Sequence, residues 1–336
     1  MSRRIPPTSL QQWLLTLANL WLISGLFLDG WAHLNVPELE TFFTPWHAVF
    51  YSGYASVTAV LIGITLKCRR MHGGSFRNAI PLGYGAALVG TILFAIGGIG
   101  DLLWHETFGI EIGVEALLSP THLILAVGGF TMLAANLRAW AFQPVSYTRL
   151  SIDQIPMLFS ATYCITLVAF MTQFTHYMKV HAGGTPMHAD LELIQSASIT
   201  GYLLHTSVLI GTLLFIAQRA RQPLGAYTLI LAVHTTGMAL LLDTLYLLPG
   251  AVVAGIVADF LGRNLLPFEQ HHLRIRVFAF GVPATLFLLY FLTIAMRDGI
   301  WWSVHMWTGS IVMAGLAGLL ISYLFLPHDT SRTLRA

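Results

Sequence analysis

The chain has 336 residues, of which 56% are hydrophobic and 10% are charged, and its formal net charge at pH 7 is +2. Soluble globular domains carry about 25% charged residues, so this composition excludes a soluble enzyme. It also excludes a disordered chain and a nucleic-acid-binding protein, since the sequence has no basic stretch to bind phosphates. Histidine departs from this pattern, because 14 are present beside 15 acidic residues. In a membrane protein such polar residues predict a functional site.

Apolar runs long enough to cross about 30 Å of hydrocarbon, which takes roughly 20 helical residues, recur along the whole sequence. In chain order they predict spans at 12–33, 45–67, 80–104, 120–141, 155–178, 196–218, 224–247, 249–266, 277–296 and 301–325. The run at 249–266 is short and contains Asp259, so an interfacial or re-entrant helix is the alternative there, which would leave nine spans. The sequence therefore predicts an all-α polytopic bundle of about ten transmembrane helices that forms a single domain over 1–336.

The distribution of charge predicts how these spans are oriented. With ten spans, one face of the membrane holds Arg3, Arg4, Lys67, Arg69, Arg70, Arg77, Arg138, Arg149, Arg219, Arg221, Arg263, Arg274, Arg276, Arg332 and Arg335, and the other holds Lys179 and Arg297. Cytoplasmic loops are enriched in Lys and Arg. We therefore expect both termini in the cytoplasm, in a bacterial or archaeal plasma membrane. Nine spans would distribute the basic residues over both faces, which favours ten.

Two stretches of the sequence repeat the same polar residues at matching spacings. The first reads Asp29-x3-His33 and then Glu40-x4-Pro45-x-His47, and the second reads Asp101-x3-His105 and then Glu115-x4-Pro120-x-His122. They define an internal repeat at 12–67, a second at 80–141 and a degenerate third copy at 155–218, with supporting helices at 219–336.

Helix geometry predicts that these polar side chains lie at one depth. Asp and His at positions i and i+4 share one face of a helix. Thr44-Pro45 and Ser119-Pro120 are typical of an N-cap followed by proline at the first helical position. His47 and His122 would then lie in the first turn of the helix that follows. All of these side chains are therefore expected near the outer membrane boundary.

Each repeat supplies carboxylate and imidazole groups suited to a divalent transition metal, and copper, iron and zinc all fit such ligands. The predicted metal ligands are Asp29, His33, His47, Asp101, His105 and His122, which would hold one ion in each half or a dinuclear centre between the halves. Glu40 and Glu115 would act as catalytic base, bridge or ligate the metals, or orient an imidazole. A proton relay and a structural hydrogen-bond network between helix ends are the alternatives.

Further polar residues extend this cluster. His176 ends the fifth predicted span at the depth of His33 and His105, so it is the next candidate ligand. The weaker candidates lie in a loop, deeper in the spans or near other span ends: His188, His205, His234, Asp243 and His305. A solvated loop histidine needs no special role, and a deep one is equally well interpreted as a proton carrier.

The spacing Asp29-x3-His33-x13-His47 resembles the Asp/His/His copper site in the C-type subunit of particulate methane and ammonia monooxygenases. The resemblance is confined to residues 29–47 and implies that these three side chains bind copper.

The sequence favours a membrane-embedded metalloenzyme that oxidises or hydroxylates an apolar substrate, or hydrolyses one, at the extracytoplasmic side. A transition-metal transporter is the first alternative, although transporter sites usually lie near the membrane midplane. The second is an electron-transfer or proton-relay subunit. The expected partners are the lipid bilayer and an apolar small molecule, without nucleic acid, and partner subunits or a homo-oligomer are left open.

Overall fold

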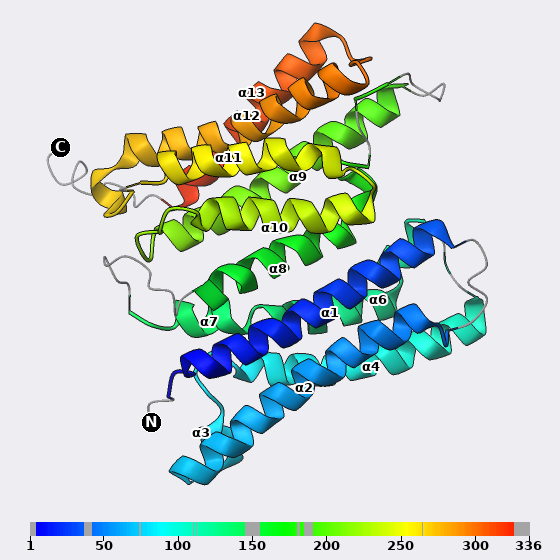
Figure 1. Cartoon of the computed structure of the whole chain (residues 1–336), viewed down its shortest axis with the longest axis vertical. Coiled ribbons are helices and arrows are strands. Elements are labelled where there is room, and N and C mark those ends of the chain that lie inside the picture. The colour runs from blue at the N-terminus through cyan, green and yellow to red at the C-terminus, as the bar shows by residue number, and fades with distance from the viewer. Residues whose placement is uncertain are drawn as a thin grey trace, which may run out of the picture. The chain divides into compact units, whose positions relative to one another are not determined.

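The structure, a computed structural model, describes residues 5–36, 42–73, 75–109, 111, 113–144, 155–179, 182–184, 191–263 and 265–325, except for the side chains of His72 and Glu269. Within these ranges the regular elements are helices (Figure 1), and an antiparallel bridge joins Gly183 and Ile300. The chain forms two compact units, described separately below. Unit 1 comprises Met1–Pro144, Ser151–Phe174 and Val233–Leu245, and unit 2 comprises Val145–Leu150, Thr175–Ala232 and Tyr246–Ala336. The single transmembrane domain stays a prediction.

Unit 1 is built around the first helices of the chain. They are α1 (Ser9–Asn35), α2 (Pro45–His72), α3 (Phe76–Ala79), α4 (Gly85–Phe108), α5 (Glu115–Leu118), α6 (Pro120–Leu133), α7 (Ala135–Ala141) and α8 (Ile155–Met171), and α10 (Ala226–Leu241) ends in this unit. α1 packs against α2 and α4 packs against α6, while α2 also contacts α4. The core between them includes Leu15, Leu22, Phe50, Phe94 and Tyr163. The two predicted repeats therefore form two helix pairs in one unit.

Unit 2 contains α9 (Leu191–Ala217), the start of α10, α11 (Leu248–Leu261), α12 (His272–Arg297) and α13 (Val304–Phe325). Short 3-10 helices occur at Gln173–Thr175, Leu245–Leu247 and Phe268–Gln270. α12 packs against α11 and α13, and α9 packs against α13. Aromatic rings fill its core, where Tyr202 lies 4.8 Å from Phe287 and Tyr177 lies 5.2 Å from Tyr290 between ring centroids.

A buried carboxylate fixes the start of α10 within unit 2. Asp259 on α11 accepts hydrogen bonds from the backbone N–H of Tyr227 at 3.0 Å and of Thr228 at 3.2 Å, and from the Thr228 hydroxyl at 2.5 Å. The first N–H groups of a helix have no partner within the helix, so this side chain supplies one from a neighbouring helix. The acidic residue of the predicted eighth span thus has a structural partner.

Among the described residues, six helices are long and apolar enough to cross a membrane: Ser9–Asn35, Pro45–Met71, Gly85–Phe108, Leu191–Ala217, His272–Arg297 and Val304–Phe325. A seventh is added if Pro120–Leu133 and Ala135–Ala141, bent by 49°, form one span. The structure therefore supports a helical membrane protein but does not support the prediction of about ten spans.

Three of the predicted spans are shorter than the apolar runs that predicted them. The helices Ile155–Met171, Ala226–Leu241 and Leu245–Leu261 are apolar but have at most 17 residues. At 1.5 Å per residue a helix of that length covers about 25 Å. α8 gives way to a 3-10 turn after Met171, and α10 ends before Asp243, whose φ is +52°. Hydropathy counts the apolar residues of such turns as part of a span, so the sequence overestimated these helices.

Candidate metal centre

The first cluster joins the end of α1 to the start of α2. The Oδ2 atom of Asp29 lies 3.5 Å from Nε2 of His47 and 3.9 Å from Nε2 of His33. The hydroxyl of Thr44 accepts a hydrogen bond from the backbone N–H of His47 at 3.1 Å, and Pro45 is the first residue of α2. This N-cap, predicted from the sequence, places His47 in the first turn with its ring toward α1. Asp29 is 8% exposed and His47 is 7% exposed.

The second cluster repeats this arrangement between α4 and α6. The Oδ1 atom of Asp101 lies 3.1 Å from Nε2 of His122 and 3.5 Å from Nε2 of His105. The Thr121 hydroxyl donates a hydrogen bond to the same oxygen at 3.1 Å. Ser119 caps α6 and accepts from the backbone N–H of His122. Asp101 is only 2% exposed, so its charge needs compensation from these neighbours.

In two of the histidines the Nδ1 atom contacts an oxygen acceptor. Nδ1 of His47 lies 2.6 Å from the backbone carbonyl oxygen of Phe42, and Nδ1 of His105 lies 3.2 Å from a carboxylate oxygen of Glu111 and 3.4 Å from the carbonyl oxygen of Gly109. These oxygens only accept hydrogen bonds, so both Nδ1 atoms carry the proton. This is the usual environment of a histidine that binds metal through Nε2.

The Nε2 atoms of the same two histidines face aspartate oxygens, and this arrangement requires a positive charge between them. A neutral imidazole with its proton on Nδ1 presents a lone pair at Nε2. In both clusters Nε2 faces an aspartate oxygen, at 3.5 Å for His47 and 3.5 Å for His105, so two acceptors face each other. Such a pair needs a cation between the two atoms, which is either a metal ion or a second proton on the ring.

The spacing of the donor atoms fits a metal ion. In each trio the candidate ligand atoms lie within 4.8 Å of one another. Four ligands placed tetrahedrally at 2.0–2.2 Å from Zn²⁺ are about 3.3 Å apart, close to the carboxylate–imidazole distances here. Each trio supplies three ligands and so keeps a coordination position open. The residues are therefore able to hold one metal ion per trio.

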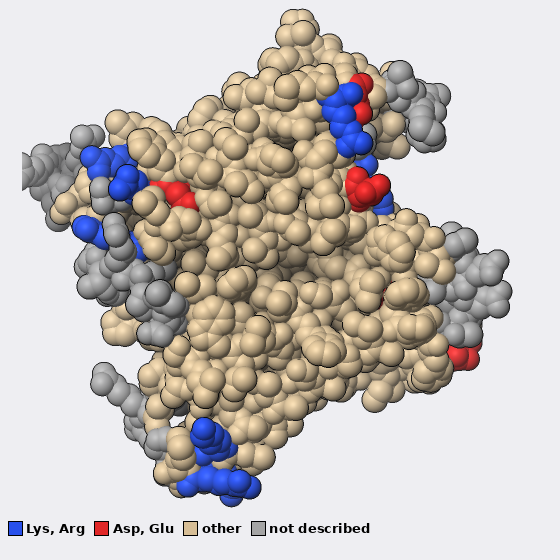
Figure 2. All heavy atoms as spheres, viewed as in Figure 1, with Lys and Arg blue, Asp and Glu red and all other residues tan. Residues whose placement is uncertain are grey.

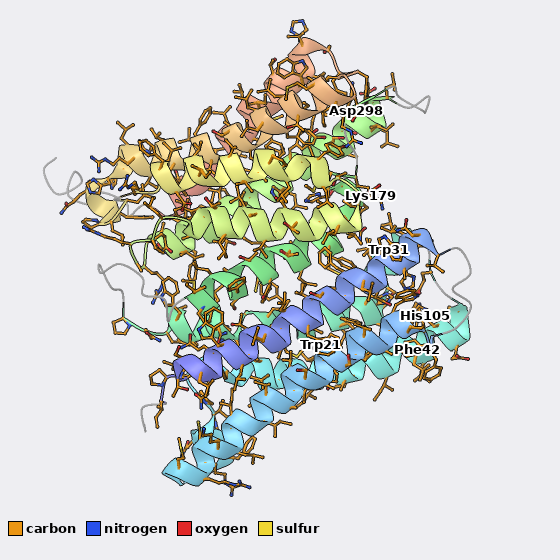
Figure 3. All side chains as sticks on the ribbon, in the orientation of Figure 1. Trp21, Trp31, Phe42, His105, Lys179 and Asp298 are labelled. Carbon is orange, nitrogen blue, oxygen red and sulfur yellow. The ribbon has the colours of Figure 1, made fainter. Side chains whose placement is uncertain are left out.

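The two clusters are neighbours within unit 1. The ring centroids of His47 and His105 are 6.5 Å apart, and Phe42 stacks on His47 at 4.9 Å and lies 6.0 Å from His105. Figure 3 shows Phe42 and His105 at the same end of this unit. Because each trio holds its own carboxylate, the geometry favours two adjacent sites over one shared centre.

Glycines set the spacing of both helix pairs one turn from the ligands. Gly25, four residues before the first aspartate, is so close to α2 that a Cβ atom there would lie 2.7 Å from Cα of Phe50. Gly97, four residues before the second aspartate, has the equivalent contact, since a Cβ atom would lie 3.0 Å from the backbone nitrogen of Leu125. Phe50 and Leu125 each follow the histidine of their own cluster by three residues. The repeat thus includes the backbone packing as well as the ligands.

The structure does not place the predicted glutamates among the metal ligands of the described residues. Glu40 and His188 lie outside the described residues. Glu115 is the exposed first residue of α5. Glu111, which the sequence did not single out, instead contacts Nδ1 of His105 and is 12% exposed at its side chain. In the sequence, Glu111 is only one of the acidic residues in the connection between His105 and His122, and no motif distinguishes it.

The remaining candidates are distributed over both units. In unit 2, His176 and His205 are buried, with ring centroids 5.4 Å apart, and Nδ1 of His176 accepts from the backbone N–H of Met178. In unit 1, His234 is buried, and its Nδ1 lies 3.2 Å from the hydroxyl of Thr166. The sequence pattern therefore found buried histidines in these places as well.

Two of the weaker candidates are exposed. Asp243 follows the end of α10 in the left-handed region, and the next residue donates its N–H to the carbonyl of Ala239, which closes the helix end. His305 is exposed in the first turn of α13. The structure gives Asp243 a helix-terminating role and leaves the predicted ligand role of His305 untested.

The chain matches no protein-family model, no curated protein and no solved structure. The candidate centre is therefore defined by its own residues and their geometry.

Proposed function

We propose that the protein is a membrane-embedded metalloenzyme with two neighbouring Asp/His/His metal sites in unit 1. The observation that supports this most is the duplicated pairing of a buried aspartate oxygen with an Nε2 atom, at 3.5 Å for His47 and 3.5 Å for His105, while acceptors occupy both Nδ1 atoms. Three protein ligands with an open position are typical of catalytic rather than structural metal sites.

The ligand set narrows the proposed chemistry. Two histidines and one carboxylate with open positions are used by non-haem iron oxygenases, and by zinc hydrolases when the metal acts on bound water. We propose oxidation or hydroxylation as the reaction and hydrolysis as the alternative, with iron, copper or zinc as the metal. Aromatic rings at this end of unit 1 are exposed, including Trp31 at 39% and Phe108 at 69%. They support an apolar substrate that arrives from the bilayer.

A transporter is the less favoured proposal because the four ligand-bearing helices offer no onward path for a cation. α2 has no Asp, Glu or His between His47 and Lys67, and α1 has none before Asp29. The same holds for α4 before Asp101 and for α6 after His122. A metal ion leaving the clusters along these helices would meet no further charged ligand.

The charges of unit 1 support an extracytoplasmic position for the centre. Lys67, Arg69 and Arg70 lie at the end of α2 opposite to His47, and Figure 2 shows the basic residues gathered at that end of the unit. By the positive-inside rule that end is cytoplasmic. We further propose that the three shorter apolar helices also cross the membrane, which keeps both termini cytoplasmic in a bacterial or archaeal plasma membrane.

Metal analysis of the purified protein tests the proposal. After reconstitution with iron(II), copper or zinc and removal of loosely bound ions, we expect one ion per trio. Replacing His305, which is exposed in unit 2, with Ala provides a matched control that should retain all of the metal. Protein that binds less than half an equivalent of each metal would refute the metal centre, and metal uptake into proteoliposomes would favour the transporter.

A further inference from the structure

Tyr51 is a polar residue of the centre that is not among the ligands. It follows His47 by one helical turn on α2, and its ring lies 6.4 Å from His47 and 5.9 Å from Phe42 between centroids. Its hydroxyl oxygen is buried and has no hydrogen-bond partner among the described residues. Tyr54, nearly one turn further along α2, instead donates to the backbone carbonyl of Thr91 at 3.0 Å. An unpaired buried donor is destabilising, so the Tyr51 hydroxyl indicates a partner outside the described residues.

The Tyr51 hydroxyl is associated with both clusters. Tyr51 belongs to the first helix pair, where its ring lies 6.4 Å from the ring of His47 between centroids. On the side of the second pair it lies against Gly98 of α4, where a Cβ atom would be 3.1 Å from the hydroxyl oxygen and 2.9 Å from Cε1 of the ring. Gly98 precedes Asp101 by three residues. The absence of a side chain at Gly98 therefore allows the phenol of one repeat to reach the ligand-bearing helix of the other.

We propose that Tyr51 donates a hydrogen bond to the non-protein ligand that occupies the open position of the metal sites. This inference rests on the proposed function. The ligand class is a small oxygen or nitrogen donor, with metal-bound water or hydroxide as the resting occupant. A hydroxide ion bound to a metal accepts such a hydrogen bond well, and hydrogen bonds to charged groups are stronger than neutral ones. The phenol keeps its proton and positions the bound ligand.

The test uses azide as the probe on full-length protein loaded with copper(II). Azide replaces bound water and gives a charge-transfer absorption band that can be titrated. We expect Tyr51→Phe to retain the copper of the wild-type protein and to bind azide about 10-fold more weakly, the loss expected for one hydrogen bond to a charged ligand. Tyr54→Phe is the matched control, because it removes a phenol from the same helix that already has a backbone partner, and it should bind azide as the wild type does.

A second variant keeps the proposal testable if Tyr51→Phe does not fold. Gly98→Ala should displace the Tyr51 ring and weaken azide binding while the ligands themselves are unchanged. Full copper content with unchanged azide affinity in Tyr51→Phe would overturn the proposal. Loss of a phenolate-to-copper absorption band in that variant would also overturn it, since Tyr51 would then be a ligand itself. If the wild-type protein holds no metal, the proposed function has failed, which the copper content reveals before azide is added.

Discussion

The change Asp101→Asn removes one carboxylate charge from the second cluster with little change of shape. The side chain is 2% exposed, and its Oδ1 atom is the oxygen that both Nε2 atoms and the Thr121 hydroxyl approach. Asparagine keeps one acceptor oxygen for Thr121 and leaves no cavity. We therefore expect the variant to fold and to lose metal only from this cluster.

The size of the effect follows from the position of the carboxylate. Removing a group that merely orients a metal ligand costs 10–100-fold in affinity. Asp101 lies among the candidate ligand atoms and supplies the only carboxylate oxygen that faces Nε2 of His122, at 3.1 Å, among the described residues. We expect its replacement to weaken metal binding at this site by at least about 100-fold, or about 2.8 kcal/mol at 1.4 kcal/mol per tenfold. The first cluster keeps its own carboxylate and should bind metal as before.

Isothermal titration calorimetry and metal analysis of the purified variant measure this loss. Asp29→Asn is the matched variant of the other half and should lose the other ion, while the double variant should lose both. Loss of both ions on Asp101→Asn alone would show that the halves share one centre. Unchanged stoichiometry and affinity would refute the reasoning, because a buried carboxylate among metal ligands cannot be removed without effect.

Glu111→Gln should weaken metal binding at the second cluster alone, by about 10-fold, because the carboxylate beside the His105 imidazole becomes a neutral amide. Calorimetry measures the affinity of both sites, and equal weakening of the two would contradict this prediction. Asp259→Ala should lower the free energy of unfolding by about 1–3 kcal/mol, because backbone N–H groups at the start of α10 lose their acceptor; denaturation in detergent micelles measures this, and an unchanged midpoint would count against it. Gly128→Ala should destabilise unit 1 by about 1–3 kcal/mol, because a Cβ atom there would lie 2.7 Å from the backbone nitrogen of Phe94. Gly129→Ala is the control with open space, since its Cβ atom would meet nothing closer than 3.8 Å, and equal losses in the two variants would exclude helix packing as the cause.

Local rules of helix formation account for how much of the centre the sequence could predict. The N-caps at Thr44 and Ser119 fixed His47 and His122 in the first turn of their helices, as expected. Asp and His four residues apart share a helix face in any helix. These features depend on neighbours in the sequence, so a pattern is sufficient to find them.

The parts that the sequence did not predict depend on contacts between segments. Glu111 is near His105 only because of the path of the chain between α4 and α6, while the regularly spaced Glu115 is exposed. The structure does not support the count of ten spans for a related reason, because hydropathy does not detect that α10 stops at Leu241 and turns at Asp243. The composition of a segment does not show where its backbone bends, and both the position of Glu111 and the lengths of the spans depend on those bends.

The glycine contacts connect the local pattern to the assembled centre. A carboxylate on one helix and an imidazole on the next bind the same ion only if the helix axes approach closely, and metal ligands must be placed to within about 0.2 Å. Gly25 and Gly97 bring each pair into backbone contact one turn from its aspartate. A larger side chain there would separate the helices where the donor atoms must converge. The two repeats therefore share both the ligands and the helix spacing that lets those ligands reach one ion. A purely structural hydrogen-bond network between helix ends would not require the helices to be spaced so strictly.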